Sequence, residues 1–372
     1  MSVSLDRFDG WLTGRTGPAA VVLREHLMPV EGEDGVLFPP TFAAGEGFSG
    51  GYNIDPPPTK DQPWQDENVC LIDSVGSQAN RIEPLFKEEP YAALVPQIVI
   101  EAGEQTVNLL DAGHRAGDAI MRCTPLAETV NEAFRAVERG DCSQLAAFAP
   151  TSLVFGAWNS RGEKGAQSKV PRLVSSTIRA FNVRLLTRGA VYVPSMDYSL
   201  AEVFSEQDKE KAEGKKTSSL AERGFVHNPA SAAHGGVIAK GGIRRDATLS
   251  LAALNKIRAG DDAEQTLKLR RYILGLALVG LTAEPDSYLR QGCNLVLNPT
   301  QPAELIEVYR NGDRKPFALS HDDALAFATL ASVAFGVGAG QTVAFDKKKA
   351  KDDVNKDVKK DVKKDVKKKD KD

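Results

Sequence analysis

Residues 160–188, in the middle of the chain, have the sequence SRGEKGAQSKVPRLVSSTIRAFNVRLLTR. It follows an apolar run at residues 152–158 that predicts a buried strand, and it opens as a glycine-containing loop. Residues 170–180 then predict a helix with Pro171 in its first turn, where proline is well tolerated. Residues 182–193 predict a strand or hairpin. The pattern therefore predicts a loop that presents an anion to the start of a helix.

The same stretch concentrates positive charge. It holds seven Lys and Arg residues and one acidic residue, a net charge of +6. The whole chain of 372 residues has 47 Lys and Arg against 50 Asp and Glu, a net charge of −3. Residues 346–372 hold 13 Lys and 8 Asp, so the rest of the chain carries a net charge of −8. This distribution excludes an indiscriminate polyanion binder and favours a localised anionic partner, with a solvated basic face as the alternative.

Working outward, strands and helices alternate irregularly. Residues 19–30 predict a first strand, and residues 31–63, rich in Gly, Pro and acidic residues, predict a long insertion. Asp246 predicts the N-cap of a helix that runs to about residue 258, and further helices are predicted at 261–281 and 320–335. This order favours an α+β fold over a doubly wound parallel sheet.

A polar cluster lies at residues 73–83, DSVGSQANRIE. A helix capped by Asp73, Ser74 or Ser77 would place Ser74, Gln78 and Arg81 on one face. Short hydroxyl, amide and guanidinium groups are suited to hydrogen bonding with sugar and phosphate oxygens. The alternative is a capped amphipathic helix whose polar face meets water.

A third cluster is HNPASAAHGGVIAKGGIRR at residues 227–245. Its two histidines lack the spacing and the carboxylate partners of a metal site, so we expect no metal. A glycine-rich loop that ends in Lys240, Arg244 and Arg245 fits contact with a nucleic-acid backbone better.

Several classes of protein are excluded. No phosphate-binding P-loop, dinucleotide fingerprint or nucleophile elbow occurs, and nothing assembles a nucleophile with its base, so we expect neither an enzyme nor a cofactor. The longest apolar run, at residues 272–281, is too short to span a bilayer. We expect a cytoplasmic protein whose cysteines are reduced core thiols. These are Cys70, Cys123, Cys142 and Cys293.

Five runs resemble the CRISPR-associated RAMP protein of type I-U systems, also called I-G, the Cas-seven-like backbone subunit of the Cascade complex. They are SQANRIEP (77–84), DAGHRAGDA (111–119), LAAFAPTSLVFGAWNSRG (145–162), AQSKVPRLVSSTIRAF (166–181) and HGGVIAKGGIRRDATLSL (234–251). The resemblance covers roughly residues 15–340.

The resemblance implies a modified RRM-like (ferredoxin-like) palm with finger and thumb insertions. The domain would be residues 1–345, with insertions at about 31–63 and about 195–245. Residues 346–372 would form a Lys/Asp-rich low-complexity tail, predicted to be disordered because so few apolar residues cannot offset the entropy of ordering.

The resemblance also implies a function. Copies of the chain would polymerise head-to-tail along one CRISPR RNA and hold it for base pairing with target DNA. Further partners would be the other Cascade subunits and the effector helicase-nuclease, with no membrane partner. The subunit would be non-catalytic. The alternative is a backbone ribonuclease that cuts target RNA at regular intervals, as type III relatives do, with Asp55 or Asp73 as candidates.

The predicted RNA-binding residues come from all three clusters. They are Ser74, Ser77, Gln78, Asn80, Arg81, Arg161, Lys164, Lys169, Arg172, Arg179, His227, His234, Lys240, Arg244 and Arg245. Their contacts should be to phosphate and ribose, and therefore independent of the guide sequence.

Overall fold

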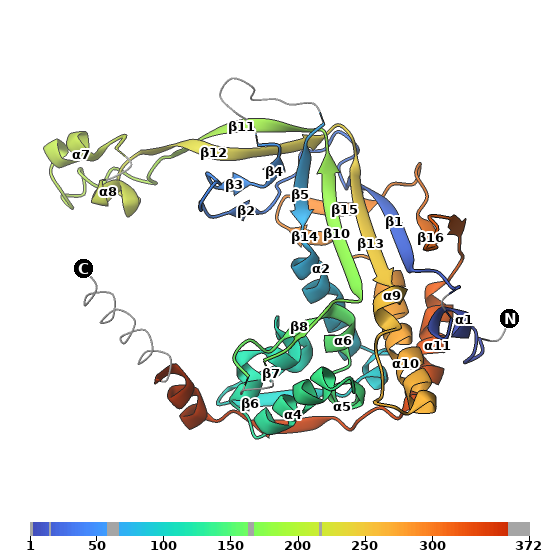
Figure 1. The fold of residues 1–372 in the computed structure, drawn as a ribbon. Coiled ribbons are helices and arrows are strands. Elements are labelled where there is room, and N and C mark those ends of the chain that lie inside the picture. Colours follow the sequence, from blue (N-terminus) through green and yellow to red (C-terminus); the bar gives the residue numbers. More distant parts are fainter. Residues whose placement is uncertain (1–2, 15, 58–66, 163–166, 216–217, 356–372) are drawn as a thin grey trace, which may run out of the picture.

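A twisted antiparallel sheet forms the centre of the protein (Figure 1). The computed structural model describes residues 3–14, 16–57, 67–162, 167–215 and 218–355. The strands lie side by side in the order β14 (Tyr288–Arg290), β15 (Cys293–Leu297), β1 (Ala20–Pro29), β13 (Ile243–Ser250), β10 (Val174–Phe181), β5 (Val69–Asp73) and β4 (Ile54–Asp55). β16 (Glu304–Val308) also pairs with β1, and β17 (Arg314–Pro316) pairs with β16.

Four of these strands have the connectivity of a ferredoxin-like unit. β15, β1, β13 and β10 are neighbours in that order, and every pair is antiparallel. α2 (Val75–Ile82) lies between β1 and β10 in the chain, and α10 (Ala263–Thr282) lies between β13 and β15. The chain thus runs from β1 to β10 and from β13 to β15 through helices, which is the split βαβ pattern. The fold is α+β, as predicted, and is compatible with an RRM-like palm.

Two predicted helices are strands. Residues 170–180 were expected to be helical, but Val174–Phe181 form β10, where β-branched residues pack well on a pleated surface. Asp246 was expected to cap a helix, but it lies inside β13, where Ile243, Arg245, Ala247 and Leu249 alternate inward with period two. Pro171 therefore starts no helix, and the predicted anion site at that helix does not exist.

The reverse error occurs just before the basic stretch. The apolar run at 152–158 was expected to be one buried strand. It forms instead the helix α6 (Thr151–Phe155) and then the short strand β8 (Ala157–Trp158). All five residues of α6 are buried, and periodicity alone cannot distinguish a short buried helix from a buried strand.

Helices cover one face of the sheet and make the main core. α10 packs on α11 (His321–Phe335), and a side chain caps the start of each helix. The Asp262 side chain accepts a hydrogen bond from the Gln265 amide, and Ser320 accepts one from the Asp323 amide. The other elements on this side are α1 (Asp9–Leu12), α3 (Ala119–Arg122), α4 (Ala127–Glu138), α5 (Ser143–Phe148), α9 (Leu251–Leu254), β6 (Ile98–Ala102), β7 (Gln105–Asn108) and β18 (Gln341–Ala344).

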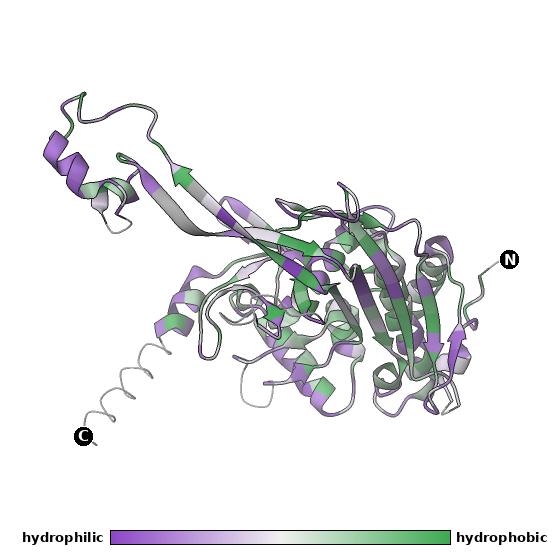
Figure 2. Cartoon of the chain, turned by 90° about the horizontal axis from the view of Figure 1, so that it is seen from above, coloured by the Kyte–Doolittle hydropathy of each residue, from purple (hydrophilic) through white to green (hydrophobic). Residues whose placement is uncertain are grey.

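A long two-stranded arm leaves the far end of the sheet (Figures 1 and 2). It consists of β11 (Val183–Tyr192) and β12 (Asn228–Ala239), with α7 (Glu206–Ala212) and α8 (Ser219–Glu222) at its tip. The tip has a small core of Ala212, Ala221 and Val226. The predicted insertion at about 195–245 therefore falls mostly on this arm.

The other predicted segments are described only in part. The insertion at 31–63 contains β2 (Thr41–Phe42) and β3 (Gly51–Tyr52), and its residues 58–63 lie outside the described residues. The tail was predicted to be disordered, yet its residues 347–355 are helical, and residues 356–372 lie outside the described residues. All four cysteines are buried and free, as expected. Within the described ranges, no helix has the length and apolar character needed to cross a membrane.

Candidate functional site

The N-terminus of α2 faces a guanidinium group. Ser74 caps this helix, because its hydroxyl accepts a hydrogen bond of 3.2 Å from the Ser77 amide. Arg172 is exposed, and its Nε donates to the Phe155 carbonyl over 2.9 Å. A Cβ built on Gly76 would lie 3.9 Å from Arg172 Nη2, so the guanidinium stands beside the first turn of the helix. A helix N-terminus with an arginine beside it favours anions.

Gly156 makes this position of Arg172 possible. Its φ is +79°, a conformation that favours glycine, and a Cβ there would lie 2.6 Å from Arg172 Cγ. The arginine stem therefore crosses the backbone at Gly156 to reach α2. This packing connects the basic stretch with the polar helix.

A buried arginine, Arg115, connects Gly156 with α2. Arg115 is 3% exposed, and its guanidinium lies 2.7 Å from a Glu83 carboxylate oxygen. It also donates to the Gly156 carbonyl over 3.2 Å and to Asn80 Oδ1 over 3.3 Å. Burial raises the pKa of Glu83 to about 7, although the charge of Arg115 opposes that shift. The sequence prediction missed Arg115, whose only signal was its place within DAGHRAGDA.

These contacts bring five of the predicted residues together. Lys169 belongs to β9 (Lys169–Val170), which pairs with β8 just before Arg172. Asn80, Lys169 and Arg172 are exposed, while Ser74 and Ser77 are half-buried. We call this set the α2–β9 surface, defined by Ser74, Ser77, Asn80, Lys169 and Arg172.

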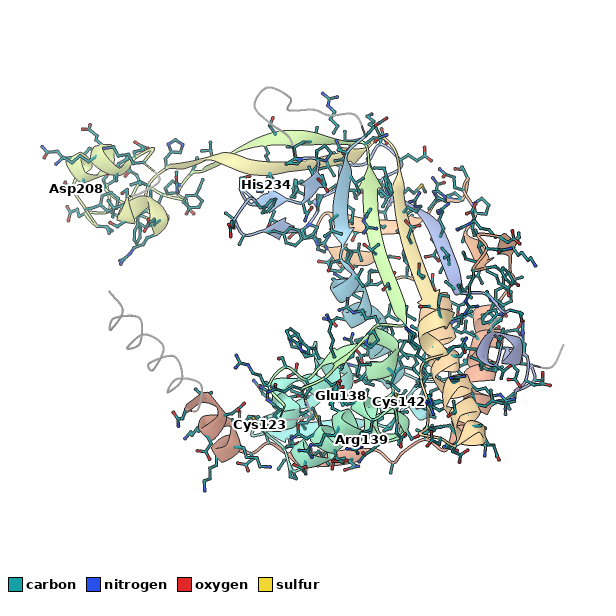
Figure 3. The ribbon with its side chains drawn as sticks, in the orientation of Figure 1. Cys123, Glu138, Arg139, Cys142, Asp208 and His234 are labelled. Carbon is teal, nitrogen blue, oxygen red and sulfur yellow. The ribbon has the colours of Figure 1, made fainter. Side chains whose placement is uncertain are left out.

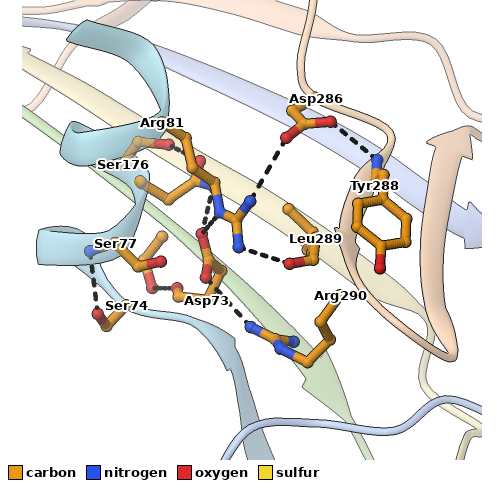
Figure 4. A network of polar contacts seen from close by, with 11 residues as sticks. Asp73, Ser74, Ser77, Arg81, Ser176, Asp286, Tyr288, Leu289 and Arg290 are labelled. Carbon is orange, nitrogen blue, oxygen red and sulfur yellow. Dashed lines mark hydrogen bonds and ion pairs between the residues drawn. The ribbon is translucent and has the colours of Figure 1, made fainter. Parts of the chain in front are cut away.

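Two predicted residues of α2, Gln78 and Arg81, contact Asp73 instead, and Figure 4 shows Arg81 beside this carboxylate. Gln78 is 5% exposed and donates to Asp73 over 2.7 Å. Arg81 donates from Nε to the same carboxylate over 3.2 Å and from Nη2 to the Leu289 carbonyl over 2.6 Å. Asp73 is only 1% exposed and also contacts Arg290 at 3.3 Å. The polar face of α2 therefore stabilises the fold, and the prediction of RNA contacts for Gln78 is wrong.

The predicted pair Arg244 and Arg245 is split between the two faces of β13. Arg245 is 2% exposed, lies 3.0 Å from Glu25 and donates to the Leu281 carbonyl, so its prediction as an RNA ligand is wrong. Arg244 points to the opposite face, where its guanidinium lies 4.6 Å from the centroid of the Phe181 ring. It also contacts Asp246 at 2.8 Å. Successive strand residues point to opposite faces, which explains the difference.

The remaining predicted residues are dispersed. Arg179 is directly opposite Arg244 in the register of β10 and β13. His227 directly precedes β12. His234 lies within β12, nearer the base of the arm than Asp208 at its tip, as Figure 3 shows. His234 is exposed, and its ring centroid is 4.7 Å from that of Tyr52. Lys240 is exposed in the turn between β12 and β13, and Arg161 is exposed in the loop after β8. Lys164 lies outside the described residues.

No metal centre emerges among the residues that the structure describes. Within them, no group of three His, Cys, Asp or Glu side chains could hold an ion. Asp73, a candidate for the alternative ribonuclease, is enclosed by Gln78, Arg81 and Arg290. Asp55 is exposed on β4.

An RRM-like sheet with a long arm and a localised basic surface is the architecture that the resemblance implies for a RAMP protein. Residues 21–185 match the family described as CRISPR-associated protein GSU0053 (Cas_GSU0053), which supports the identification of this chain as a CRISPR-associated protein. The matched residues include the whole α2–β9 surface. No curated protein matches the chain.

Proposed function

We propose that this protein is a non-catalytic, CRISPR RNA-binding backbone subunit of a type I-U/I-G Cascade complex. The observation that carries the proposal is the family match over residues 21–185, the part of the chain that contains the α2–β9 surface. The basic stretch supports it, because Arg172 presents a cation beside the N-terminus of α2 and Lys169 is exposed three residues earlier in β9. An RNA backbone offers the phosphates that such a surface favours.

The surface is suited to reading the backbone of RNA rather than its bases. Its hydroxyl, amide, ammonium and guanidinium groups can contact phosphate and ribose in any sequence. The bases would then remain free to pair with target DNA, so the guide itself would supply sequence specificity. This proposed division of roles makes one protein compatible with every guide.

Assembly along the RNA would use the arm and the acidic body. A subunit that repeats head-to-tail makes a heterologous contact, in which two different surfaces of neighbouring copies meet. The chain outside residues 346–372 carries a net charge of −8, so acidic surfaces are available to face basic ones on a neighbour. The other Cascade subunits and the helicase-nuclease would bind this filament.

The environment of Asp73 weighs against the ribonuclease alternative. Two guanidinium groups and an amide occupy its carboxylate, and its side chain is almost fully buried. A general base or a metal ligand needs access to the substrate. This carboxylate serves the fold instead.

Copurification tests the proposal. The full chain is expressed with its CRISPR locus, isolated, and its nucleic acid is sequenced. We expect homogeneous CRISPR RNA with several protein copies per guide. Random cellular RNA or no RNA would contradict RNA binding of this kind. Cuts at regular spacing in an added complementary RNA, dependent on a divalent metal, would contradict the non-catalytic role.

A further inference from the structure

One large aromatic side chain stands exposed next to the α2–β9 surface. Trp158 is the second residue of β8, and 58% of its surface is exposed. The two other tryptophans are Trp11, which is 7% exposed, and Trp64, which lies outside the described residues. The indole is a large apolar ring that proteins usually bury for the most part. An indole exposed next to cations therefore suggests that a bound partner covers it.

The backbone that carries this ring is held firmly. Ala157 and Trp158 pair with Val170 and Lys169 in the β8–β9 ladder. The next residue, Asn159, is fully buried, and its amide donates to the Ser168 carbonyl over 3.0 Å. On the other side, a Cβ at Gly117 would lie 2.6 Å from the Trp158 carbonyl oxygen, so this loop packs directly on the strand. The ring is therefore exposed on a fixed support, which suits a binding platform.

The charged residue opposite the ring is positive, and so are most of its neighbours in the sequence. Trp158 and Lys169 are directly opposite in an antiparallel pair, so their side chains project from the same face. Both side chains are exposed. Between residues 155 and 172 the sequence has one acidic residue, Glu163, against four basic ones. A ring and an ammonium side by side match the base and the phosphate of one nucleotide.

A second exposed aromatic residue provides the contrast. Tyr288 on β14 is 59% exposed, similar to Trp158. Its amide donates to the carboxylate of Asp286, and Glu284 lies four residues before it in the chain. Asp286 is paired with Arg81 at 3.4 Å, and the residue opposite Tyr288 in the β14–β15 ladder is Asn294, so Tyr288 lacks the cross-strand ammonium group that Lys169 provides beside Trp158.

We propose that the Trp158 ring stacks on a nucleobase of the bound RNA while Lys169 contacts the adjacent phosphate. The inference rests on the proposed RNA-binding function and adds to it a position at which a base is held by the protein. Stacking tolerates every base because each has a π face, so it agrees with binding that is independent of guide sequence.

The test uses the full chain and a fluorescein-labelled single-stranded RNA of mixed sequence, with binding followed by fluorescence anisotropy at several salt concentrations. We expect Trp158→Ala to weaken binding by about 10- to 100-fold and Trp158→Phe to retain most of the affinity. The matched control, Tyr288→Ala, should bind like the wild type. Trp158→Ala should leave the salt slope unchanged, whereas Lys169→Ala should reduce it by roughly 0.7.

A second oligonucleotide, with abasic sites in place of bases, separates stacking from general damage to the fold. On this ligand the Trp158→Ala and wild-type proteins should bind equally. Equal affinity of both proteins for the normal RNA would overturn the stacking role and leave the proposed function intact. A weaker Trp158→Ala complex on both ligands would also overturn it. Absence of any RNA binding by the wild type would instead overturn the proposed function, and the inference with it.

Discussion

Arg81 Nε lies 3.2 Å from Asp73 Oδ2, which joins the polar face of α2 to the residue that ends β5. The other oxygen of the same carboxylate contacts Arg290, the last residue of β14, at 3.3 Å. One buried carboxylate thus connects a helix, the end of β5 and β14. From the sequence, arginines such as Arg81 and Arg290 could be RNA ligands or surface charges. In the structure both neutralise the buried carboxylate of Asp73.

Asp73→Asn should therefore destabilise the protein. The substitution removes the negative charge that two guanidinium groups share, and we expect the free energy of unfolding to fall by roughly 3 kcal/mol. Urea denaturation followed by circular dichroism measures it. The matched control is Asp111→Asn, whose carboxylate forms an exposed pair with Lys87 at 2.5 Å and should change stability by less than about 1 kcal/mol. Equal effects of the two substitutions would contradict the structural role of Asp73.

Arg172→Ala should weaken RNA binding without unfolding the chain. Arg172 is exposed and makes one hydrogen bond to a backbone carbonyl, so its removal leaves no buried charge behind. We expect lower affinity by the same factor for unrelated guide sequences, and a salt slope reduced by roughly 0.7 for one lost phosphate contact. Fluorescence anisotropy over a salt series measures both.

The control for Arg172 is Arg314→Ala. Arg314 is exposed on β17, which pairs with β16 at the edge of the sheet away from α2 (Figure 1). The Arg314→Ala substitution removes the same charge from another surface, so it should leave the affinity for RNA and the salt slope unchanged. A loss specific to one guide, or an equal loss for both variants, would rule out a localised backbone contact at Arg172.

Glu83 should make stability depend on pH. Burial raises its pKa from an ordinary value of 4.5 to about 7, so the folded state holds this proton more tightly than the unfolded state. The stability that this proton contributes is complete below about pH 4.5 and is lost as the pH rises through about 7. Glu83→Gln removes this titration. As the pH rises from about 4.5 through about 7, the free energy of unfolding of the wild type should therefore fall relative to that of the variant. Parallel pH profiles of the two proteins would contradict this prediction.

The cysteine thiols should be inert in the folded protein. All four are buried, and burial raises the pKa of Cys70 to about 12. Because the thiolate is the reactive species, labelling by Ellman's reagent at pH 8 should be slow without denaturant and rapid in urea. A thiol that reacts rapidly in the native protein, identified by mass spectrometry, would show that its site opens.

The sequence by itself determined the local elements with strong signals. The β-branched start of residues 19–30 predicted a strand, which the structure has at Ala20–Pro29, and the helices predicted at 261–281 and 320–335 are α10 and α11. Caps and periodicity act over a few residues, so they are legible without the rest of the chain. The runs that resemble the RAMP family predicted the class of protein, and the family match over residues 21–185 supports a CRISPR-associated protein.

Only the tertiary structure decided which polar side chains are available to a partner. Arg244 and Arg245 are neighbours in sequence, yet pairing of β13 with β1 sends one to each face of the sheet. The partners of Arg81 and Arg115 include residues more than thirty positions away, Leu289 for the first and Asn80 for the second. Burial and long-range pairing depend on which surfaces meet in the folded chain, and local sequence signals do not contain that information. The α2–β9 surface consequently exists only once α2, β8 and β9 have come together.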